Sequence, residues 1–396
     1  MVSAKTNQWS PIRQKSSLIA WIIIIIGTLA GCDFKLPSPP PDLFFKFNVM
    51  RIGMGPSYLI SNDLNLDGAM DIISANTKGG SITILFGHGD GTFEYPLRIK
   101  TLPEPSSLVV EDINRDGIPD IAFNSRGANS FLTLMGKGNG EFSKLRKIPT
   151  GKVPLFILLD DFNNDGKFDA AVSLTFNKLE IFLGYGKGHF QKSRTIEMRS
   201  RSFSGITGDF NQDGNKDIAM AGSSSNSSGI IIFLGDGTGN FKKPSIVAKG
   251  LMPLSIISKD MNGDKKEDLI TATAKGDNIF MLYSNGDGTF QKEIPFSGAG
   301  GPISLTANTF NSDDMVDVAI ANSRSSSFSL AIRKPNGSFL YKTRDYVTGG
   351  TPLAITSADY NSDGLQDIAV ASNAEGTVEI FLRKRMPLNS DTSKLN

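Results

Sequence analysis

The chain has 396 residues, enough for one large all-β domain or two smaller domains. Its 41 Lys and Arg residues are balanced by 40 Asp and Glu residues, which argues against general nucleic-acid binding, and its 41 glycines and 19 prolines favour short strands joined by turns. The single cysteine excludes an intramolecular disulfide and a cysteine-based zinc cluster, and the two histidines leave little for histidine-dependent catalysis.

Residues 1–31 have the pattern of an export signal. Three basic residues and no acidic one precede a mostly apolar run from Leu18 to Ala30, which is short for a membrane-spanning helix. The run ends in Leu-Ala-Gly-Cys, which resembles the lipobox of bacterial lipoproteins. That resemblance implies cleavage before Cys32 and anchoring to the inner or outer membrane of a bacterial cell envelope through lipid on Cys32. An uncleaved anchor helix is the alternative.

The segment that follows Cys32 reads as a tether. Residues 33–42, DFKLPSPPPD, are proline-rich and favour an extended conformation, so residues 32–42 are expected to link the lipidated cysteine to a folded domain. We expect that domain to span residues 43–386. The polar C-terminal segment, residues 387–396, is predicted to be disordered.

A nine-residue acidic pattern recurs seven times in the predicted domain. It begins at residues 63, 112, 161, 209, 260, 309 and 359, and the first copy reads DLNLDGAMD. Each copy is followed by a β-branched run, a polar loop, a second run and a glycine turn, with a phenylalanine after six of the turns, at residues 93, 142, 190, 241, 290 and 339. We interpret this phenylalanine as a filler between neighbouring units. A period near 49 residues in such a sequence indicates radial or linear repetition of one unit.

The repeat predicts an all-β, seven-bladed β-propeller of four-stranded antiparallel blades. Seven small sheets cover one another when they are arranged around an axis. The seventh unit ends after Leu382 without a fourth strand, whereas residues 43–51 supply a strand that precedes the first acidic loop. We therefore expect this N-terminal strand to complete blade seven and close the ring, which removes open sheet edges. A linear β-solenoid is the competing architecture.

The acidic loops have the chemistry of calcium sites. Side-chain oxygens at positions 1, 3 and 5, a backbone carbonyl at position 7 and an aspartate at position 9 are hard donors, and glycine at position 6 permits the turn. We predict five to six calcium sites, because Lys265 replaces the glycine of loop five, and Thr309 and Asp314 replace the first aspartate and the glycine of loop six, which is expected to be empty. The alternative is a set of Asx turns that bind no metal. The predicted ligands are Asp63, Asn65, Asp67, Ala69, Asp71; Asp112, Asn114, Asp116, Ile118, Asp120; Asp161, Asn163, Asp165, Lys167, Asp169; Asp209, Asn211, Asp213, Asn215, Asp217; Asp260, Asn262, Asp264, Lys266, Asp268; and Asp359, Asn361, Asp363, Leu365, Asp367.

The loops, the glycine-phenylalanine turns and the period together resemble the FG-GAP or VCBS repeats, which build the propeller of integrin α subunits and of many bacterial surface proteins. The resemblance covers roughly residues 43–386. It implies calcium loops on one face and a partner on the opposite face or the rim. Members include adhesion subunits, lectin-like propellers and accessory modules of enzymes, so the fold alone does not decide the activity.

The loops opposite the acidic loops carry an excess of basic residues. An anionic partner, either an acidic protein surface or an anionic polysaccharide, is the hypothesis that this excess supports, and an ordinary solvated face is the alternative. We find no catalytic constellation, so the chain is predicted to be a non-catalytic calcium-binding lipoprotein for adhesion or protein interaction. A lectin is the second hypothesis and an accessory module, hydrolase or lyase the third. The candidate partner-binding residues are Arg126, Lys178, Arg199, Arg201 and Arg324.

Overall fold

The computed structural model describes residues 42–224, 228–274, 276–298 and 300–385. The predicted export signal, the lipidated Cys32, nearly all of the tether and the C-terminal tail lie outside these ranges. Within them, no helix is long and apolar enough to cross a membrane.

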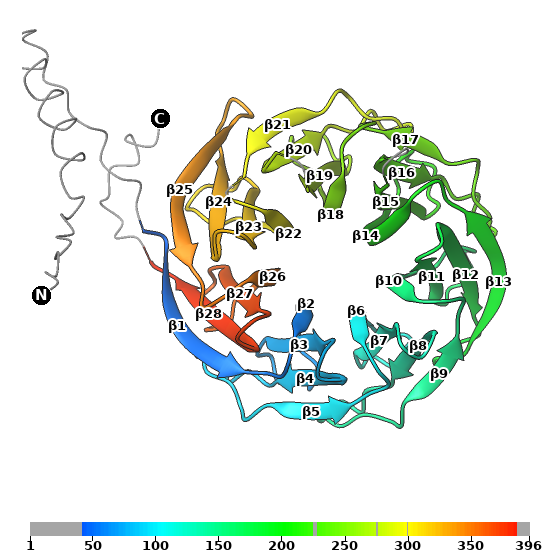
Figure 1. Cartoon of the computed structure of the whole chain (residues 1–396), viewed down its shortest axis with the longest axis horizontal. Coiled ribbons are helices and arrows are strands. Elements are labelled where there is room, and N and C mark those ends of the chain that lie inside the picture. The colour runs from blue at the N-terminus through cyan, green and yellow to red at the C-terminus, as the bar shows by residue number, and fades with distance from the viewer. Residues whose placement is uncertain (1–41, 225–227, 275, 299, 386–396) are drawn as a thin grey trace, which may run out of the picture. The chain divides into compact units, whose positions relative to one another are not determined.

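Twenty-eight strands form seven four-stranded antiparallel sheets, arranged as blades around a central channel (Figure 1). This is the predicted propeller. From the channel outward, blade one is β2 (Pro56–Asn62), β3 (Asp71–Asn76), β4 (Ser81–Leu85), β5 (Leu97–Lys100); blade two is β6 (Pro105–Glu111), β7 (Asp120–Ser125), β8 (Ser130–Leu134), β9 (Arg146–Pro149); blade three is β10 (Pro154–Asp160), β11 (Asp169–Leu174), β12 (Lys178–Gly184), β13 (Phe190–Glu197); and blade four is β14 (Arg201–Gly208), β15 (Asp217–Ser223), β16 (Gly229–Phe233), β17 (Ser245–Val247). Blade five is β18 (Pro253–Lys259), β19 (Asp268–Thr273), β20 (Asn278–Leu282), β21 (Ile294–Ser297); blade six is β22 (Pro302–Asn308), β23 (Asp317–Asn322), β24 (Ser327–Arg333), β25 (Phe339–Val347); and blade seven is β26 (Pro352–Ala358), β27 (Asp367–Ser372), β28 (Thr377–Arg383), β1 (Phe44–Arg51).

The second strand of each blade is the most buried, because each of its faces packs against a neighbouring blade. All six residues of β3 (DIISAN) are buried, and β7, β11, β19, β23 and β27 show the same pattern. Continuous burial explains why these segments are short runs of β-branched and small residues without alternating polarity. The outermost strands, such as β5, are largely exposed.

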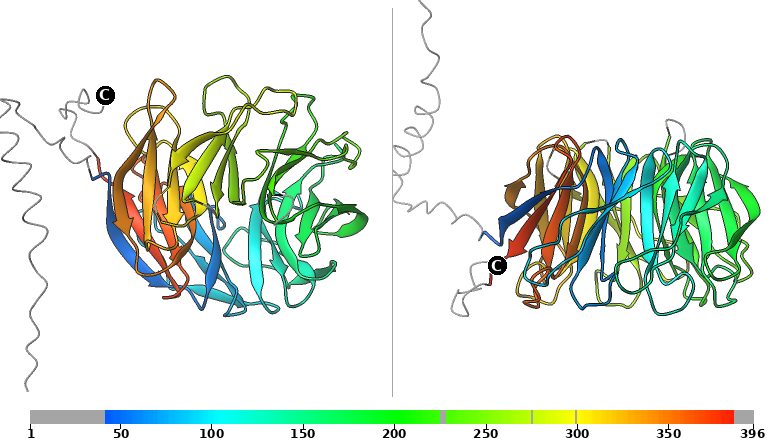
Figure 2. Two further views of the ribbon diagram at one scale, coloured as in Figure 1. Left: turned by 45° about the horizontal axis from the view of Figure 1, so that its top comes forward. Right: turned by 90° about the horizontal axis from the view of Figure 1, so that it is seen from below.

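The ring closes as predicted, through β1. This strand pairs antiparallel with β28, from Phe44 opposite Arg383 to Arg51 opposite Thr377. The Phe44 ring is buried against three aromatic rings of blade six, those of Phe310, Phe328 and Tyr346, at centroid distances of 5.7 to 6.1 Å. Figure 2 shows β1 on the outside of the ring, where it covers the edge that β28 would otherwise expose.

The phenylalanines that follow the glycine turns lie between blades, as interpreted from the sequence. Phe93 of blade one contacts Tyr360 of blade seven at a centroid distance of 5.8 Å. Phe241 of blade four contacts Phe162 of blade three at 5.5 Å. Each partner is the residue at position 2 of a neighbouring acidic loop, so one apolar contact joins the turn of one blade to the loop of the blade before it.

Candidate functional site

The seven acidic loops all lie on one face of the ring, here called the aspartate face. Each joins the innermost strand of a blade to the second strand, as loop 63–70 joins β2 to β3. The turns between the second and third strands, such as residues 77–80, and the connections between blades lie at the opposite ends of these strands, on what we call the turn face (Figure 2).

In six loops the first aspartate holds the turn by accepting two backbone hydrogen bonds. In loop one, the Asp67 N–H donates to Asp63 Oδ1 at 3.1 Å and the Gly68 N–H donates to Asp63 Oδ2 at 2.9 Å. The same two bonds recur in loops two, three, four, five and seven, at 3.0 to 3.2 Å and 2.7 to 2.9 Å. The first aspartate is therefore an Asx-type cap for its own loop.

Positions 3, 5 and 7 are linked in the same way. Asn65 Oδ1 accepts the Asp67 N–H at 3.2 Å, and Asp67 Oδ1 accepts the Ala69 N–H at 2.8 Å. The bond from position 7 to position 5 recurs in all six loops, at 2.8 to 3.0 Å, so the structure places the predicted ligands of positions 1 to 7 around one tight turn.

The aspartate at position 9 joins its loop to the glycine turn of the same blade. Asp217 is fully buried, and its two carboxylate oxygens accept the N–H groups of Phe210 at 2.9 Å and Gly235 at 2.8 Å. Equivalent pairs of bonds occur in all seven blades. Burial is the main cause that raises the pKa of Asp217 to about 6, and the nearby carboxylates of Asp213 and Asp209 raise it further.

Loop five keeps the regular geometry although it lacks the glycine at position 6. Lys265 occupies that position with φ 65°, the left-handed conformation that Gly68 and Gly214 adopt in loops one and four. The Lys265 N–H donates to Asp260 Oδ2 at 2.7 Å, as the glycine N–H does elsewhere. A residue with a Cβ is strained in this region by about 1 kcal/mol, so loop five is preserved at a cost in stability.

The donor set of these six loops fits calcium in its chemistry. Every side-chain donor is an oxygen, and a carboxylate oxygen that accepts one N–H keeps a second lone pair for a cation. However, no group of three or more Asp, Glu, His or Cys side chains within the described ranges converges to hold a metal ion. The aspartates are oriented instead by the backbone N–H groups. In loops three and five the lysine at position 7 also pairs with the aspartate at position 5, at 3.1 Å and 3.6 Å, and so competes with a metal.

Loop six does not fit calcium, and a side chain from blade seven contacts it. Thr309 replaces the first aspartate, and neither residue 312 nor residue 314 adopts a left-handed conformation. Arg383, 7% exposed at the end of β28, donates from its guanidinium to the backbone carbonyls of Thr309 and Asn311. Burial lowers the pKa of Arg383, whereas Asp317, Asp363 and other aspartates of loops six and seven raise it. An organic cation therefore lies beside the loop that lost a metal ligand.

The sequence reasoning missed Arg383. The signal was present in the repeat itself, because the equivalent residue is glycine in blades one to four, serine in blade five and arginine in blades six and seven. These residues are Gly87, Gly136, Gly184, Gly235, Ser284, Arg333 and Arg383.

On the turn face, two of the five candidate partner-binding residues are already paired. Lys178 forms an ion pair with Glu197 at 3.3 Å, and Arg324 forms one with Asp277. Arg126 is partly buried, and its Nε has no hydrogen-bond partner in the described part of the chain. Arg199 and Arg201 are exposed and have no carboxylate partner within the described ranges. The excess positive charge that is free to meet a partner is therefore concentrated where blade three joins blade four.

Two exposed aromatic side chains lie beside these arginines. Phe176, 64% exposed, occupies the turn between β11 and β12, and this turn is tied to the connection before β14 by the Met198 N–H, which donates to the Asn177 carbonyl at 2.6 Å. The Arg201 guanidinium lies 5.6 Å from the ring centroid of Phe203, which is 43% exposed. We call these four residues, Phe176, Arg199, Arg201 and Phe203, the arginine-aromatic patch.

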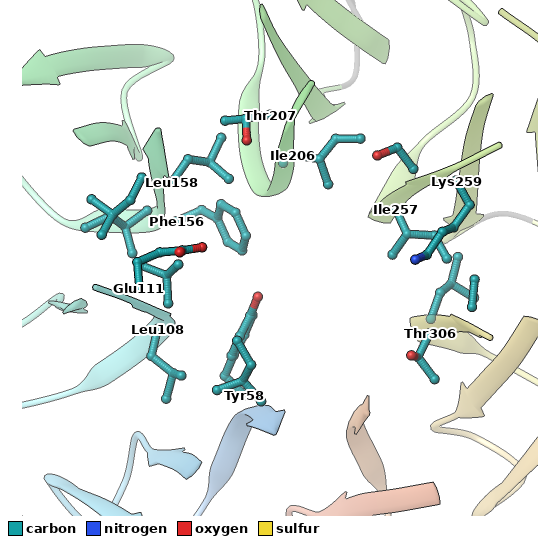
Figure 3. A pocket seen from close by; sticks show the side chains of 18 of the residues that line it. Tyr58, Leu108, Glu111, Phe156, Leu158, Ile206, Thr207, Ile257, Lys259 and Thr306 are labelled. Carbon is teal, nitrogen blue, oxygen red and sulfur yellow. The ribbon is translucent and has the colours of Figure 1, made fainter. Parts of the chain in front are cut away.

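The central channel contains a cavity of about 520 Å³ (Figure 3). Its wall is mainly apolar, and the Tyr58 and Phe156 rings contact each other at a centroid distance of 6.1 Å. Burial raises the pKa of Tyr58 to about 12, so its hydroxyl is neutral at physiological pH. Glu111 and Lys259 lie on opposite walls in Figure 3 and form no ion pair with each other, so these two residues do not make an acid-base pair in the channel.

Comparison with known proteins identifies the repeat. The sequence matches the FG-GAP-like repeat over residues 63–123, 112–172, 161–220, 209–271 and 310–370, which together span more than half of the chain. No curated protein matches the sequence significantly.

Solved structures share the fold at low sequence identity. BBS1N in complex with ARL6DN is 11% identical, with a TM-score of 0.62 over 87% of this chain and 98% of that chain. Streptogramin B lyase is 14% identical, with a TM-score of 0.60 over 87% and 100%. An Agrocybe aegerita lectin that recognises non-reducing terminal N-acetylglucosamine is 17% identical, with a TM-score of 0.51 over 75% and 79%. These similarities concern the fold alone.

Proposed function

The chain belongs to the FG-GAP-like repeat family, and from this premise we propose that it is a lipid-anchored, calcium-binding interaction platform of a bacterial cell envelope. In this proposal Cys32 carries the anchor, the aspartate face binds calcium, and the turn face binds an anionic partner protein without catalysis. The observation that carries the proposal is the arginine-aromatic patch.

The patch has the composition of a protein-binding hot spot. Arginine and aromatic side chains dominate binding energy in protein interfaces, and Phe176 supplies exposed apolar area beside two arginines that have no carboxylate partner in the described ranges. Such positive charge also accelerates association with an acidic surface. The six regular loops support the calcium part of the proposal, because their oxygen donors are arranged alike in every one.

The partner role is tested by charge reversal. The variant Arg126→Glu/Arg199→Glu/Arg201→Glu is expected to lose the envelope proteins that crosslink to the wild-type lipoprotein in intact cells. Lys144→Glu/Lys147→Glu, on the exposed rim of blade two, is the matched control and is expected to keep them. Equal crosslinking by both variants, at equal melting temperature, would refute the role of the turn face.

A lectin is the second candidate, because exposed aromatic rings beside polar groups also suit a sugar and a lectin shares the fold. A glycan array with the chain from residue 33, in millimolar calcium and in EDTA, separates the two. Calcium-dependent binding to anionic glycans would favour the lectin, and a blank array would favour a protein partner. Streptogramin B lyase also shares the fold, but the channel arrangement of Glu111 and Lys259 supports no lyase or hydrolase proposal here.

A further inference from the structure

The outer side of β1 exposes an apolar stripe. Phe45 is 41% exposed, Phe47 43% and Val49 52%. The register of β1 against β28 shifts between Lys46 and Asn48, so Phe47 is the extra residue of a bulge, and three consecutive residues, 45 to 47, are exposed. The Phe45 and Phe47 rings contact each other edge to face at 6.3 Å. Large side chains that pack on one another outside the core form a surface suited to an apolar partner.

The stripe continues into blade one. The Phe47 ring lies against Gly91, where a Cβ would meet it at 3.1 Å, and Tyr95, four residues further along the chain, is 93% exposed. Leu97, at the start of β5, is 39% exposed. The outer rim of the seam between blades seven and one is therefore aromatic and aliphatic. We call Phe45, Phe47, Val49, Tyr95 and Leu97 the seam stripe.

A basic pocket lies at the end of β1. It has a volume of about 310 Å³, and Arg51, Lys78 and Arg98 line it together with Glu375 and the exposed Met54. Arg98 donates to the Arg51 carbonyl at 3.3 Å, whereas the side chains of Arg51 and Lys78 have no partner within the described ranges. Three cations against one carboxylate suit an anionic group, and the pocket directly follows the apolar stripe on the same strand.

We propose that the seam stripe and this pocket dock on an anionic phospholipid bilayer. The stripe would enter the interfacial region and the pocket would hold a lipid phosphate, as aromatic and basic residues do at membrane surfaces. The inference rests on the proposed anchor, because only eleven residues separate Cys32 from Phe44 and span at most about 40 Å when fully extended. A lipid on Cys32 keeps the strand that carries the stripe within that distance of the membrane.

Tryptophan fluorescence tests the proposal, because both tryptophans of the chain, Trp9 and Trp21, precede Cys32. The variant Phe47→Trp therefore carries a single tryptophan after signal cleavage. Ile294→Trp, on outer strand β21 of blade five and also partly exposed, is the matched control. Each lipidated protein is reconstituted in vesicles of phosphatidylcholine, phosphatidylglycerol and a brominated lipid, which together give an anionic surface and a quencher inside the bilayer. Fluorescence is expected to be quenched in the Phe47→Trp protein and not in the Ile294→Trp protein.

The basic pocket has its own variant. Arg51→Gln/Arg98→Gln is expected to reduce partitioning onto anionic vesicles by about fivefold for each charge removed and to leave partitioning onto phosphatidylcholine alone unchanged. Phe45→Ser, at an exposed site, is expected to weaken binding to both. Equal quenching of the Phe47→Trp and Ile294→Trp proteins, when both are lipidated, would overturn the proposal. A stable dimer that buries the tryptophan of the Phe47→Trp protein without vesicles would overturn it as well.

The anchor and the docking surface can fail separately. Mass spectrometry of Cys32 from cell membranes reports the anchor. The Phe47→Trp chain from residue 33, held on nickel-chelating lipid by an N-terminal histidine tag, reports docking without the anchor. Quenching on these vesicles with no lipid on Cys32 in cells would retain the docking surface and refute the anchor, and the reverse result would retain the anchor and refute docking.

Discussion

Replacing Arg383 by methionine removes the cation beside loop six and keeps most of the volume of the side chain. The guanidinium donates to two backbone carbonyls and lies near Asp317, whose pKa burial raises to about 7. Breaking a buried charged contact on one side costs about 3 to 5 kcal/mol, because the other groups stay buried without a partner. Unfolding entropy of about 2.1 cal/mol/K per residue in a ring of this size converts that loss to a fall in Tm of about 5 °C.

The assay is thermal unfolding followed by far-UV circular dichroism, at one scan rate, in calcium and in EDTA. The loss is expected to be equal in both, since loop six lacks the first aspartate. Arg333→Met is the control, because Arg333 has the equivalent position in blade six and its side chain makes no hydrogen bond in the described ranges. Adding Thr309→Asp and Asp314→Gly to Arg383→Met is expected to restore stability only in calcium. A Tm for Arg383→Met equal to that of Arg333→Met, or recovery of Arg383→Met itself by calcium, would refute the reasoning.

Three further results are expected from the same assay. Lys265→Gly should raise stability by about 1 kcal/mol, because glycine adopts the left-handed conformation at φ 65° without strain, and Lys266→Gly should not. Asp217→Ala should cost about 2 to 4 kcal/mol with or without calcium, because it leaves two buried N–H groups without an acceptor, whereas Asp213→Ala should cost stability only in calcium; equal losses in EDTA would contradict this division of roles. Phe44→Ala should cost about 3 to 5 kcal/mol and open the ring to proteolysis, and a melting curve like that of the wild type would contradict the role given to this residue in closure.

The ring could be predicted from the sequence because its main determinants are local and repeated. The period places one acidic loop in every blade, and a glycine turn with its phenylalanine in most of them, so seven imperfect copies report the same structure. Closure was predictable for a related reason: blade seven lacked a fourth strand at one end of the chain, and residues 43–51 supplied an unassigned strand at the other end.

Long-range contacts account for what the sequence could not show. The position 9 aspartate was assigned only to a metal, but its carboxylate orientation depends on an N–H eighteen residues away in the case of Asp217 and Gly235. Arg383 reaches a loop more than seventy residues earlier in the chain, so no local pattern reveals the contact. The calcium ligand set itself stays a prediction, which metal analysis of the purified chain can test.

The two proposed surfaces are consistent with each other in space. The seam stripe lies between blades seven and one, and in a ring of seven blades the point opposite that seam is blade four. Arg201 and Phe203 lie on β14 of blade four, and Figure 1 shows β14 across the channel from β1. A ring that docks through the seam has its channel axis along the membrane plane, so blade four is the blade farthest from the bilayer. The arginine-aromatic patch would then face outward, where a partner protein can reach it without competing with lipid for the same positive charges.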